Sequence, residues 1–184
     1  MSCLMRYLLP AMLCLLSGCS LFSPAPDLPP ALALLPPSEG PAPVLLKQTV
    51  AMEAQGERFQ FLVVSRFDAK QARLVALMPT GQQLTALEYD GARLQQSAAV
   101  PLELPGRAIL ATMQFALWPE ASVRKHYSAV QGWTLRLEAN RRQLWHHGAR
   151  FLDIVQEVDT TRVRNYPGEY QVIIKTLEQK DLEQ

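Results

Sequence analysis

The sequence predicts an α+β fold in which helices pack on one face of a curved antiparallel β-sheet. Short segments rich in β-branched and aromatic residues, separated by turn residues, run from about Leu45 to Val100. One helical stripe follows between Pro105 and Pro119, and a second group of β-type segments begins at Trp133. The chain of 184 residues is long enough for one domain with a hydrophobic core and short for two.

The first group of β-type segments predicts a meander of hairpins. Its strands are expected at residues 57–67, 71–78, 82–89 and 93–100. Pro79-Thr80-Gly81 supplies a turn between two of them, and Asp90-Gly91 is a strong hairpin signal. Tight turns between consecutive strands are typical of antiparallel pairing.

The middle of the chain predicts one helix followed by a shorter one. Apolar residues recur there at helical spacing, namely Ile109, Leu110, Met113, Ala116 and Leu117. Pro119 ends this helix and opens the next, which is expected to run through Tyr127. We expect the apolar stripe to lie across the sheet.

The second group of β-type segments predicts a second meander. Trp133, Leu135 and Leu137 alternate with polar residues, as in a half-buried strand. Further strands are expected at residues 142–147, 151–158 and 170–177. Residues 159–161 are expected to form a turn, and the charged residues 179–184 a frayed tail.

The first 18 residues are predicted to form a lipoprotein signal peptide. Arg6 supplies its positive charge, and the apolar run 7–16 is too short for a membrane-spanning helix, which needs about 20 apolar residues. Leu16-Ser17-Gly18-Cys19 resembles the bacterial lipobox, which implies cleavage between Gly18 and Cys19 and acylation of the Cys19 thiol. The alternative is an ordinary secretory signal that happens to end near a cysteine.

The positions of the cysteines exclude several kinds of site from the mature domain. Cys3 and Cys14 lie in the predicted signal peptide, and Cys19 would carry lipid, so the mature domain would have no disulfide, thiol nucleophile or cysteine-bound zinc. Ser20 follows the anchor cysteine, where lipoproteins kept in the inner membrane usually carry Asp. That resemblance implies an outer-membrane anchor, with the domain facing the periplasm.

Residues 19–44 are predicted to be the lipidated cysteine and a proline-rich tether. Residues 20–43 hold eight of the fourteen prolines, and proline favours an extended chain. The apolar stretch 31–35 is either part of a plain linker or a segment that docks on another surface.

The charge balance argues against a nucleic-acid binder, which would normally show a basic face. The chain has 18 Lys and Arg against 17 Asp and Glu, and Arg6 is the only charged residue before Cys19. Surface charge therefore cannot hold the protein to a membrane, and attachment would rest on the acyl anchor.

No catalytic or metal-binding pattern emerges from the polar residues, so we expect no enzyme, no metal and no cofactor. His146 and His147 are neighbours on a predicted strand and should point to opposite faces, while His126 is expected on a solvated face. Asp153 and Glu157 lie four residues apart on one strand, roughly 13 Å, which is too far for a paired acid and base.

Apolar residues load both faces of the first strands, which leaves two interpretations open. The sheet either has a filled core, or it curves into a trough that encloses an apolar cavity. The candidate cavity-lining residues are Phe59, Phe61, Val63, Leu74, Trp133, Leu135 and Leu137.

Five features occur together: the lipobox, the proline-rich tether, the early hairpins, the segment 107–119 (RAILATMQFALWP), and the turn Tyr166-Pro167-Gly168-Glu169-Tyr170. In this combination the chain resembles an uncharacterised proteobacterial lipoprotein family found in aryl-polyene gene clusters, which is similar in architecture to the lipoprotein carriers LolA and LolB. The resemblance covers residues 45–178 as a single domain. It implies an unclosed half-barrel with one or two helices on its concave face, and no catalytic residue.

These observations lead us to expect an outer-membrane lipoprotein that binds or transfers a lipid-like or acylated molecule, with aryl-polyene lipid among the candidates. Its partners would be the membrane, through the anchor, and the lipid ligand. The alternative is a non-enzymatic structural or assembly factor that contacts an envelope protein.

Overall fold

The computed structural model describes residues 30–99 and 105–183 of the chain. A compact unit runs from Ala31 to Gln184. The predicted signal peptide, its cleavage site, the anchor at Cys19 and the first part of the tether lie outside the described residues.

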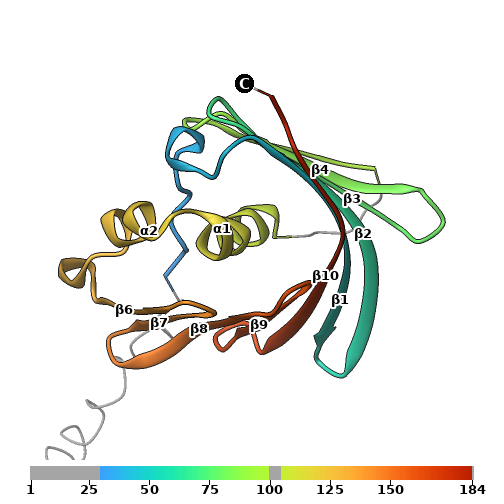
Figure 1. Ribbon diagram of the computed structural model, residues 1–184. Helices are drawn as coiled ribbons and strands as arrows, with labels where there is room; N and C mark the ends of the chain where they lie inside the picture. Colours follow the sequence, from blue (N-terminus) through green and yellow to red (C-terminus); the bar gives the residue numbers. More distant parts are fainter. Residues whose placement is uncertain (1–29, 100–104, 184) are drawn as a thin grey trace, which may run out of the picture. The chain divides into compact units, whose positions relative to one another are not determined.

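The described residues form a ten-stranded antiparallel sheet that does not close into a barrel (Figure 1). Its strands are β1 (Val44–Ala54), β2 (Glu57–Phe67), β3 (Ala72–Leu77), β4 (Gln83–Tyr89), β5 (Leu94–Ala98), β6 (Trp133–Glu138), β7 (Arg141–His146), β8 (Ala149–Gln156), β9 (Thr160–Asn165) and β10 (Tyr170–Asp181). Their order across the sheet is β5-β4-β3-β2-β1-β10-β9-β8-β7-β6. The predicted α+β fold with an unclosed half-barrel is confirmed.

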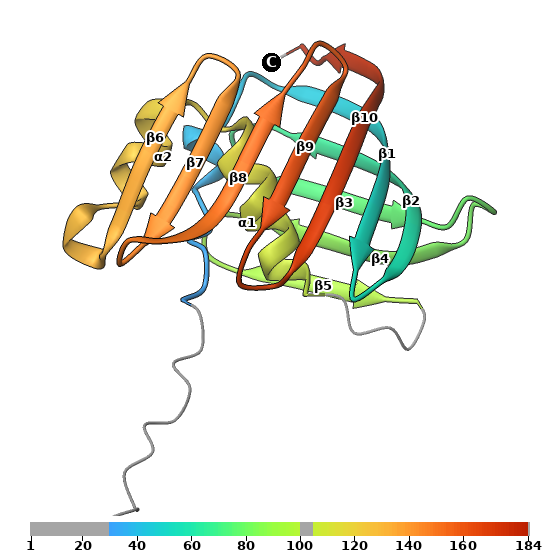
Figure 2. The same cartoon turned by 90° about the horizontal axis from the view of Figure 1, so that it is seen from below.

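Two meanders therefore meet at the pairing of β1 with β10, which joins the first and last strands in the sequence (Figure 2). The pairing runs from Val44 opposite Asp181 to Ala54 opposite Tyr170, with a register shift between Lys47 and Gln48. We call this pairing the central seam.

Two helices connect the meanders: α1 (Gly106–Leu117) and α2 (Glu120–His126). Figure 1 shows α1 inside the curve of the sheet. The predicted apolar stripe is buried or partly buried, but α1 is also buried on its other sides, since every residue from Leu110 to Ala116 is buried. Pro119 separates the helices as expected. Arg142 of β7 donates hydrogen bonds to the carbonyl oxygens of Phe115 (2.9 Å) and Trp118 (2.7 Å), so a cation satisfies carbonyls at the α1 C-terminus.

Two predictions made along the chain were wrong in detail. Residues 160–165 form β9 rather than leaving a turn, because β9 carries only one large apolar side chain, Val163, and so gives a weak pattern. The tail is not frayed up to Asp181, since β10 continues there and pairs with the start of β1. Leu182 also donates its N–H to the carbonyl of Pro43 (2.8 Å).

The tether prediction is wrong for residues 31–40, which pack against the helices, and for Val44, which begins β1. Leu32 and Leu35 belong to the hydrophobic core. The side chain of Gln114, in α1, accepts a hydrogen bond from the Leu35 N–H and donates one to the Leu35 carbonyl, both at 2.8 Å. Trp118 Nε1 donates to the Pro36 carbonyl (3.0 Å), and the Tyr127 hydroxyl donates to the Ala33 carbonyl (3.3 Å). The folded unit therefore begins at Ala31 rather than at residue 45. We call residues 31–40 the N-terminal clasp.

An ionic cluster fixes the end of this clasp to α2. Glu39, in a 3₁₀ turn (Pro37–Glu39), pairs with Lys125, while its carboxylate lies 2.9 Å from His126 Nε2 and accepts a hydrogen bond from the Ser122 hydroxyl (3.0 Å). The hydrogen bond from Lys125 is the main reason that the pKa of Glu39 falls to about 2. Glu39 thus stays ionised over the whole neutral range of pH.

Candidate ligand-binding cavity

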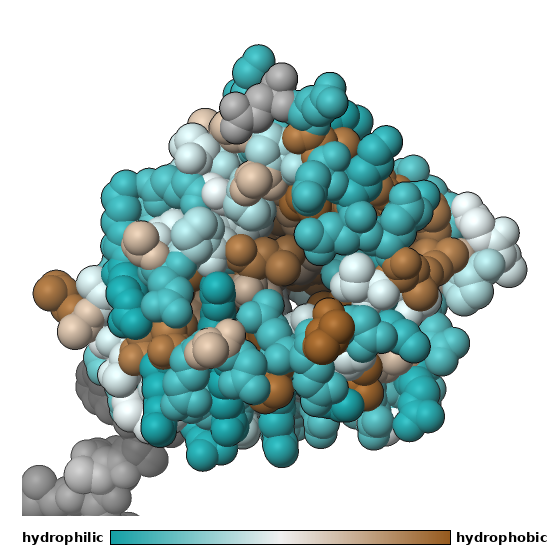
Figure 3. Space-filling model, viewed as in Figure 1, coloured by the Kyte–Doolittle hydropathy of each residue, from teal (hydrophilic) through white to brown (hydrophobic). Residues whose placement is uncertain are grey.

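An apolar cavity of about 190 Å³ lies between α1 and the concave face of the sheet. Its lining residues come from six strands, from α1 and from the residue before α1: Gln48, Val50, Met52, Phe61, Val63, Leu74, Ala76, Thr85, Pro105, Ile109, Thr112, Met113, Val163, Tyr170, Val172 and Ile174. Figure 3 shows a hollow near the middle of one face of the molecule, edged by hydrophobic residues.

The register of the strands arranges the sheet side of the cavity in three rows. The inner row is Thr176, Gln48, Val63, Ala76 and Thr85, from β10 across to β4. The middle row is Ile174, Val50 and Phe61, and the outer row is Val172, Met52 and Phe59. The inner and outer rows lie four residues apart along each strand, or roughly 13 Å.

Burial gives the cavity a direction. In the inner row Gln48 and Val63 are buried, whereas Val50 and Phe61 of the middle row are only partly buried. In the outer row Phe59 is 39% exposed and stacks on Phe61, with ring centroids 6.3 Å apart. The cavity therefore opens at the outer row and ends at the inner row.

The volume limits what the cavity can hold in this conformation. Pockets for drug-sized ligands span about 300–1,000 Å³, whereas a dry apolar cavity of about 150 Å³ is already large enough for benzene. About 190 Å³ therefore suits a short alkyl segment or a single ring. A longer chain would have to leave the cavity through its mouth or displace α1.

Four polar side chains lie in the lining. Gln48 donates through Nε2 to the Thr176 hydroxyl (3.2 Å), and the Thr85 hydroxyl donates to the Ser97 carbonyl (3.0 Å). Burial raises the pKa of the Tyr170 hydroxyl, while its contacts with Thr112 and Asn165 act in the opposite direction. The remaining lining is hydrocarbon or sulfur, so the cavity favours an apolar guest.

Three of the seven predicted lining residues, Phe61, Val63 and Leu74, do line the cavity. Phe59 lies at its mouth. The other three, Trp133, Leu135 and Leu137, belong to β6 at the far edge of the sheet and do not line it. Trp133 packs instead against Tyr127 and Phe151, with ring centroids 5.5 and 5.1 Å apart.

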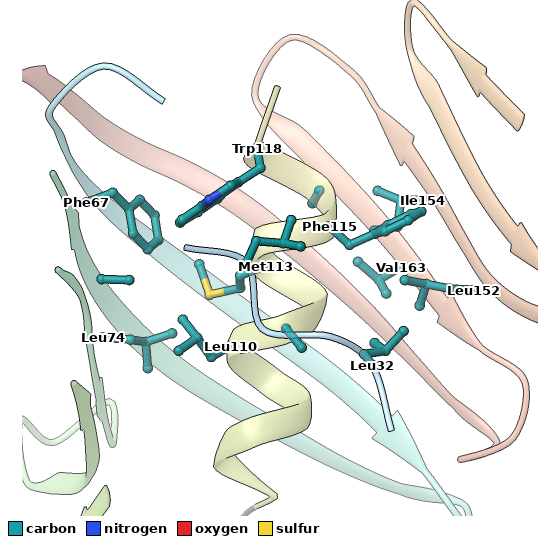
Figure 4. Packing of buried hydrophobic residues seen from close by; sticks show 14 of the residues in the cluster. Leu32, Phe67, Leu74, Leu110, Met113, Phe115, Trp118, Leu152, Ile154 and Val163 are labelled. Atoms are coloured by element: carbon teal, nitrogen blue, oxygen red, sulfur yellow. The ribbon is translucent and has the colours of Figure 1, made fainter. Parts of the chain in front are cut away.

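The rest of the concave side is a filled core. Figure 4 shows Phe67 and Trp118 facing each other beside α1, and Phe115 near Ile154. The Phe67 and Trp118 rings meet edge to face with centroids 5.2 Å apart. The sequence left open whether the sheet has a filled core or encloses a cavity. Both occur, on different parts of one sheet.

Sequence reasoning missed the part of the cavity wall that β10 and α1 form. The residues of β10 and α1 that line it are Tyr170, Val172, Ile174, Ile109, Thr112 and Met113. The alternation of apolar residues in 170–174 and the apolar stripe of the helix could have indicated this part of the wall, because each pattern identifies an apolar face. No sequence pattern indicated Gln48 as a lining residue, since a lone glutamine near the start of a strand is usually solvated.

His146 and His147 lie in contact with each other, and Asp153 lies in an ion pair. The expectation that His146 and His147 point to opposite faces is wrong: His147 leaves the strand with a φ of 46°, and the two rings lie 4.3 Å apart. Asp153 binds Arg141 at 2.6 Å and Gln143 at 3.1 Å, and the Arg141 hydrogen bond lowers its pKa. Over residues 30–99 and 105–183, His, Cys, Asp and Glu nowhere gather in a group of three that could hold a metal ion.

A family model described as "Protein of unknown function (DUF3261)" matches residues 45–178. No curated protein matches the chain. In the described part of the chain, neither α1 nor α2 has the length and apolar character that crossing a bilayer requires.

Proposed function

Given that the chain belongs to the DUF3261 family of proteins of unknown function, we propose that it is an outer-membrane lipoprotein that binds or hands over a lipid-like molecule, with its domain facing the periplasm. The observation that carries the proposal is the apolar cavity under α1, open at the outer row and closed at the inner row. A curved sheet with a helix on its concave side is also the architecture of the lipoprotein carriers LolA and LolB. The role needs no catalysis, and aryl-polyene lipid and other acylated envelope molecules are the candidate ligands.

The cavity suits binding because its contacts are non-directional. Each methylene group that leaves water for this lining contributes about 0.8 kcal/mol. Few groups in the lining would select one headgroup, which suits a protein that passes its ligand on. The size of the cavity favours a bound chain segment over a whole lipid.

A second candidate, a structural or assembly factor that contacts an envelope protein, is favoured by the convex face. Ile173 of β10 is 46% exposed there, in a shallow depression that is lined by apolar residues such as Ala51 and Leu62 together with Thr49, Gln60 and Lys175. An exposed apolar side chain surrounded by polar ones suits contact with a protein partner. In this reading the cavity would be empty in the cell.

The Val50→Trp variant separates the two candidates. Val50 lies in the middle row, and an indole at this position should fill the cavity and lower the amount of co-purified lipid at least tenfold. The measurement is native mass spectrometry of the chain from Ser20 to Gln184, purified after secretion by a Gram-negative host.

Thr49→Trp is the matched control, because Thr49 is similar in size and points to the opposite face of the same strand. It should keep the lipid content of the unmodified chain. If the unmodified chain carries no lipid and binds no fluorescent fatty acid, the carrier proposal fails and the second candidate is favoured.

The anchor is tested at Cys19. Wild-type cells should incorporate labelled palmitate into the protein, and the Cys19→Ala variant should incorporate none, because only a thiol at the cleavage site accepts the diacylglyceryl group. Two or three chains would then hold the protein in the membrane essentially permanently, whereas a single chain gives reversible binding. Normal processing of Cys19→Ala, together with an unlabelled wild type, would refute the lipoprotein assignment.

A further inference from the structure

A glutamine amide is buried without a full set of partners at the closed end of the cavity. Gln48 is 6% exposed and lines the cavity from the inner row. Its Nε2 donates to Thr176, but its Oε1 has no hydrogen-bond partner among the residues that the structure describes. Because Thr176 can donate as well as accept, rotating the amide by 180° would only leave the nitrogen unpaired instead.

An unpaired amide at this position is costly. A buried polar group without a partner costs about 1–3 kcal/mol, and a leucine of similar size would avoid that cost. The neighbours of Gln48 do not supply the missing bond: Val63 is its register partner on β2, and Val50 follows it on the same face of β1. The free amide atom is itself buried, and it belongs to a side chain that lines the closed end of the cavity.

The inner row is the polar row of the cavity. Thr176, Gln48 and Thr85 lie in it, whereas the middle and outer rows carry apolar side chains only. Along these rows of the sheet, a chain that enters at the outer row passes roughly 13 Å of apolar side chains before it reaches these groups, while Tyr170 and Thr112 add polar groups elsewhere in the lining. The sheet is thus polar at the closed end of the cavity, unlike the wall of a simple pocket for a fatty-acid tail.

We infer that the cavity recognises a ligand whose apolar segment carries a hydrogen-bonding group, such as a hydroxyl or carbonyl, at its inner end, and that Gln48 binds that group. This inference rests on the proposed function. The ligand class is an apolar chain or ring system that is polar at both ends, with one end in solvent at the mouth and the other against Gln48.

A pair of fatty acids that differ only at the inner end tests this. The chain from Ser20 to Gln184 is titrated with decanoic acid and with 10-hydroxydecanoic acid, using displacement of a fluorescent fatty acid. The charged carboxylate keeps the acid end in water at the mouth. We expect the hydroxy acid to bind about fivefold more tightly, as one additional hydrogen bond would give.

Gln48→Leu should reverse this preference, because the hydroxyl would then enter an apolar site without a partner. Gln60→Leu, on the opposite and exposed face of β2, is the control and should keep the preference of the unmodified chain. Equal affinities for the two acids, or an unchanged preference in Gln48→Leu, would overturn the inference and leave lipid binding intact. Failure of both acids to bind would overturn the proposed function as well.

Discussion

Trp118→Ala is expected to lower the free energy of unfolding by about 4 kcal/mol, the range for a fully buried aromatic side chain. Trp118 is 1% exposed, and its ring meets Phe67 of β2 edge to face. Its Nε1 also donates to the carbonyl of Pro36 in the N-terminal clasp. Removal of the indole would leave a cavity where α1, β2 and the clasp meet.

Urea unfolding followed by circular dichroism measures this loss. Trp118→Phe keeps much of the volume but not the N–H donor, so it should lose roughly half as much stability. Phe59→Ala removes a partly exposed aromatic from the mouth of the cavity and should cost far less. A loss below about 1.5 kcal/mol for Trp118→Ala would show that the clasp and the helix do not depend on this contact.

Gln114→Ala is expected to cost about 3 kcal/mol, because it leaves two buried backbone groups of the clasp without partners. The Gln114 amide pairs with both the N–H and the carbonyl of Leu35 at 2.8 Å, as a neighbouring strand would. Both residues are fully buried, so water cannot replace these bonds without opening the structure.

Hydrogen exchange at the Leu35 amide reports this effect directly. Exchange at this position should accelerate strongly in Gln114→Ala, while the amides of the central seam should exchange only as fast as the lower global stability requires. Gln171→Ala, on the exposed face of β10, is the matched control and should change neither quantity. Unchanged protection of Leu35 would mean that the clasp is held by its apolar contacts alone.

Most of the fold could be predicted because alternation and helical spacing are local signals. The strand at residues 57–67 and both helices lie where those patterns place them. The clasp could not be predicted, because a proline-rich segment has few backbone donors to satisfy and reads as solvated chain. Its main polar partner is Gln114, a glutamine in a largely apolar helix, and nothing in the sequence indicates what this side chain binds.

The cavity lining could be predicted only in part, because the cavity occupies only one region of a large sheet. Alternation correctly placed Phe61, Val63 and Leu74 on the concave face. It could not show that Trp133 and its neighbours on β6 lie on a stretch of the same sheet that is packed against other aromatic residues. Whether a concave residue faces space or a helix depends on where α1 lies across ten strands.

The central seam has a consequence for how the molecule assembles. β1 and β10 are neighbours in space but stand at opposite ends of the folded sequence, so closing them is entropically the most demanding step in building the sheet. Until that step, β1 and β10 each present an unpaired edge of backbone donors and acceptors, of the kind that adheres to other chains. The central seam, which lies in the middle of the finished sheet, is thus the place where the partly folded chain is most exposed to mispairing.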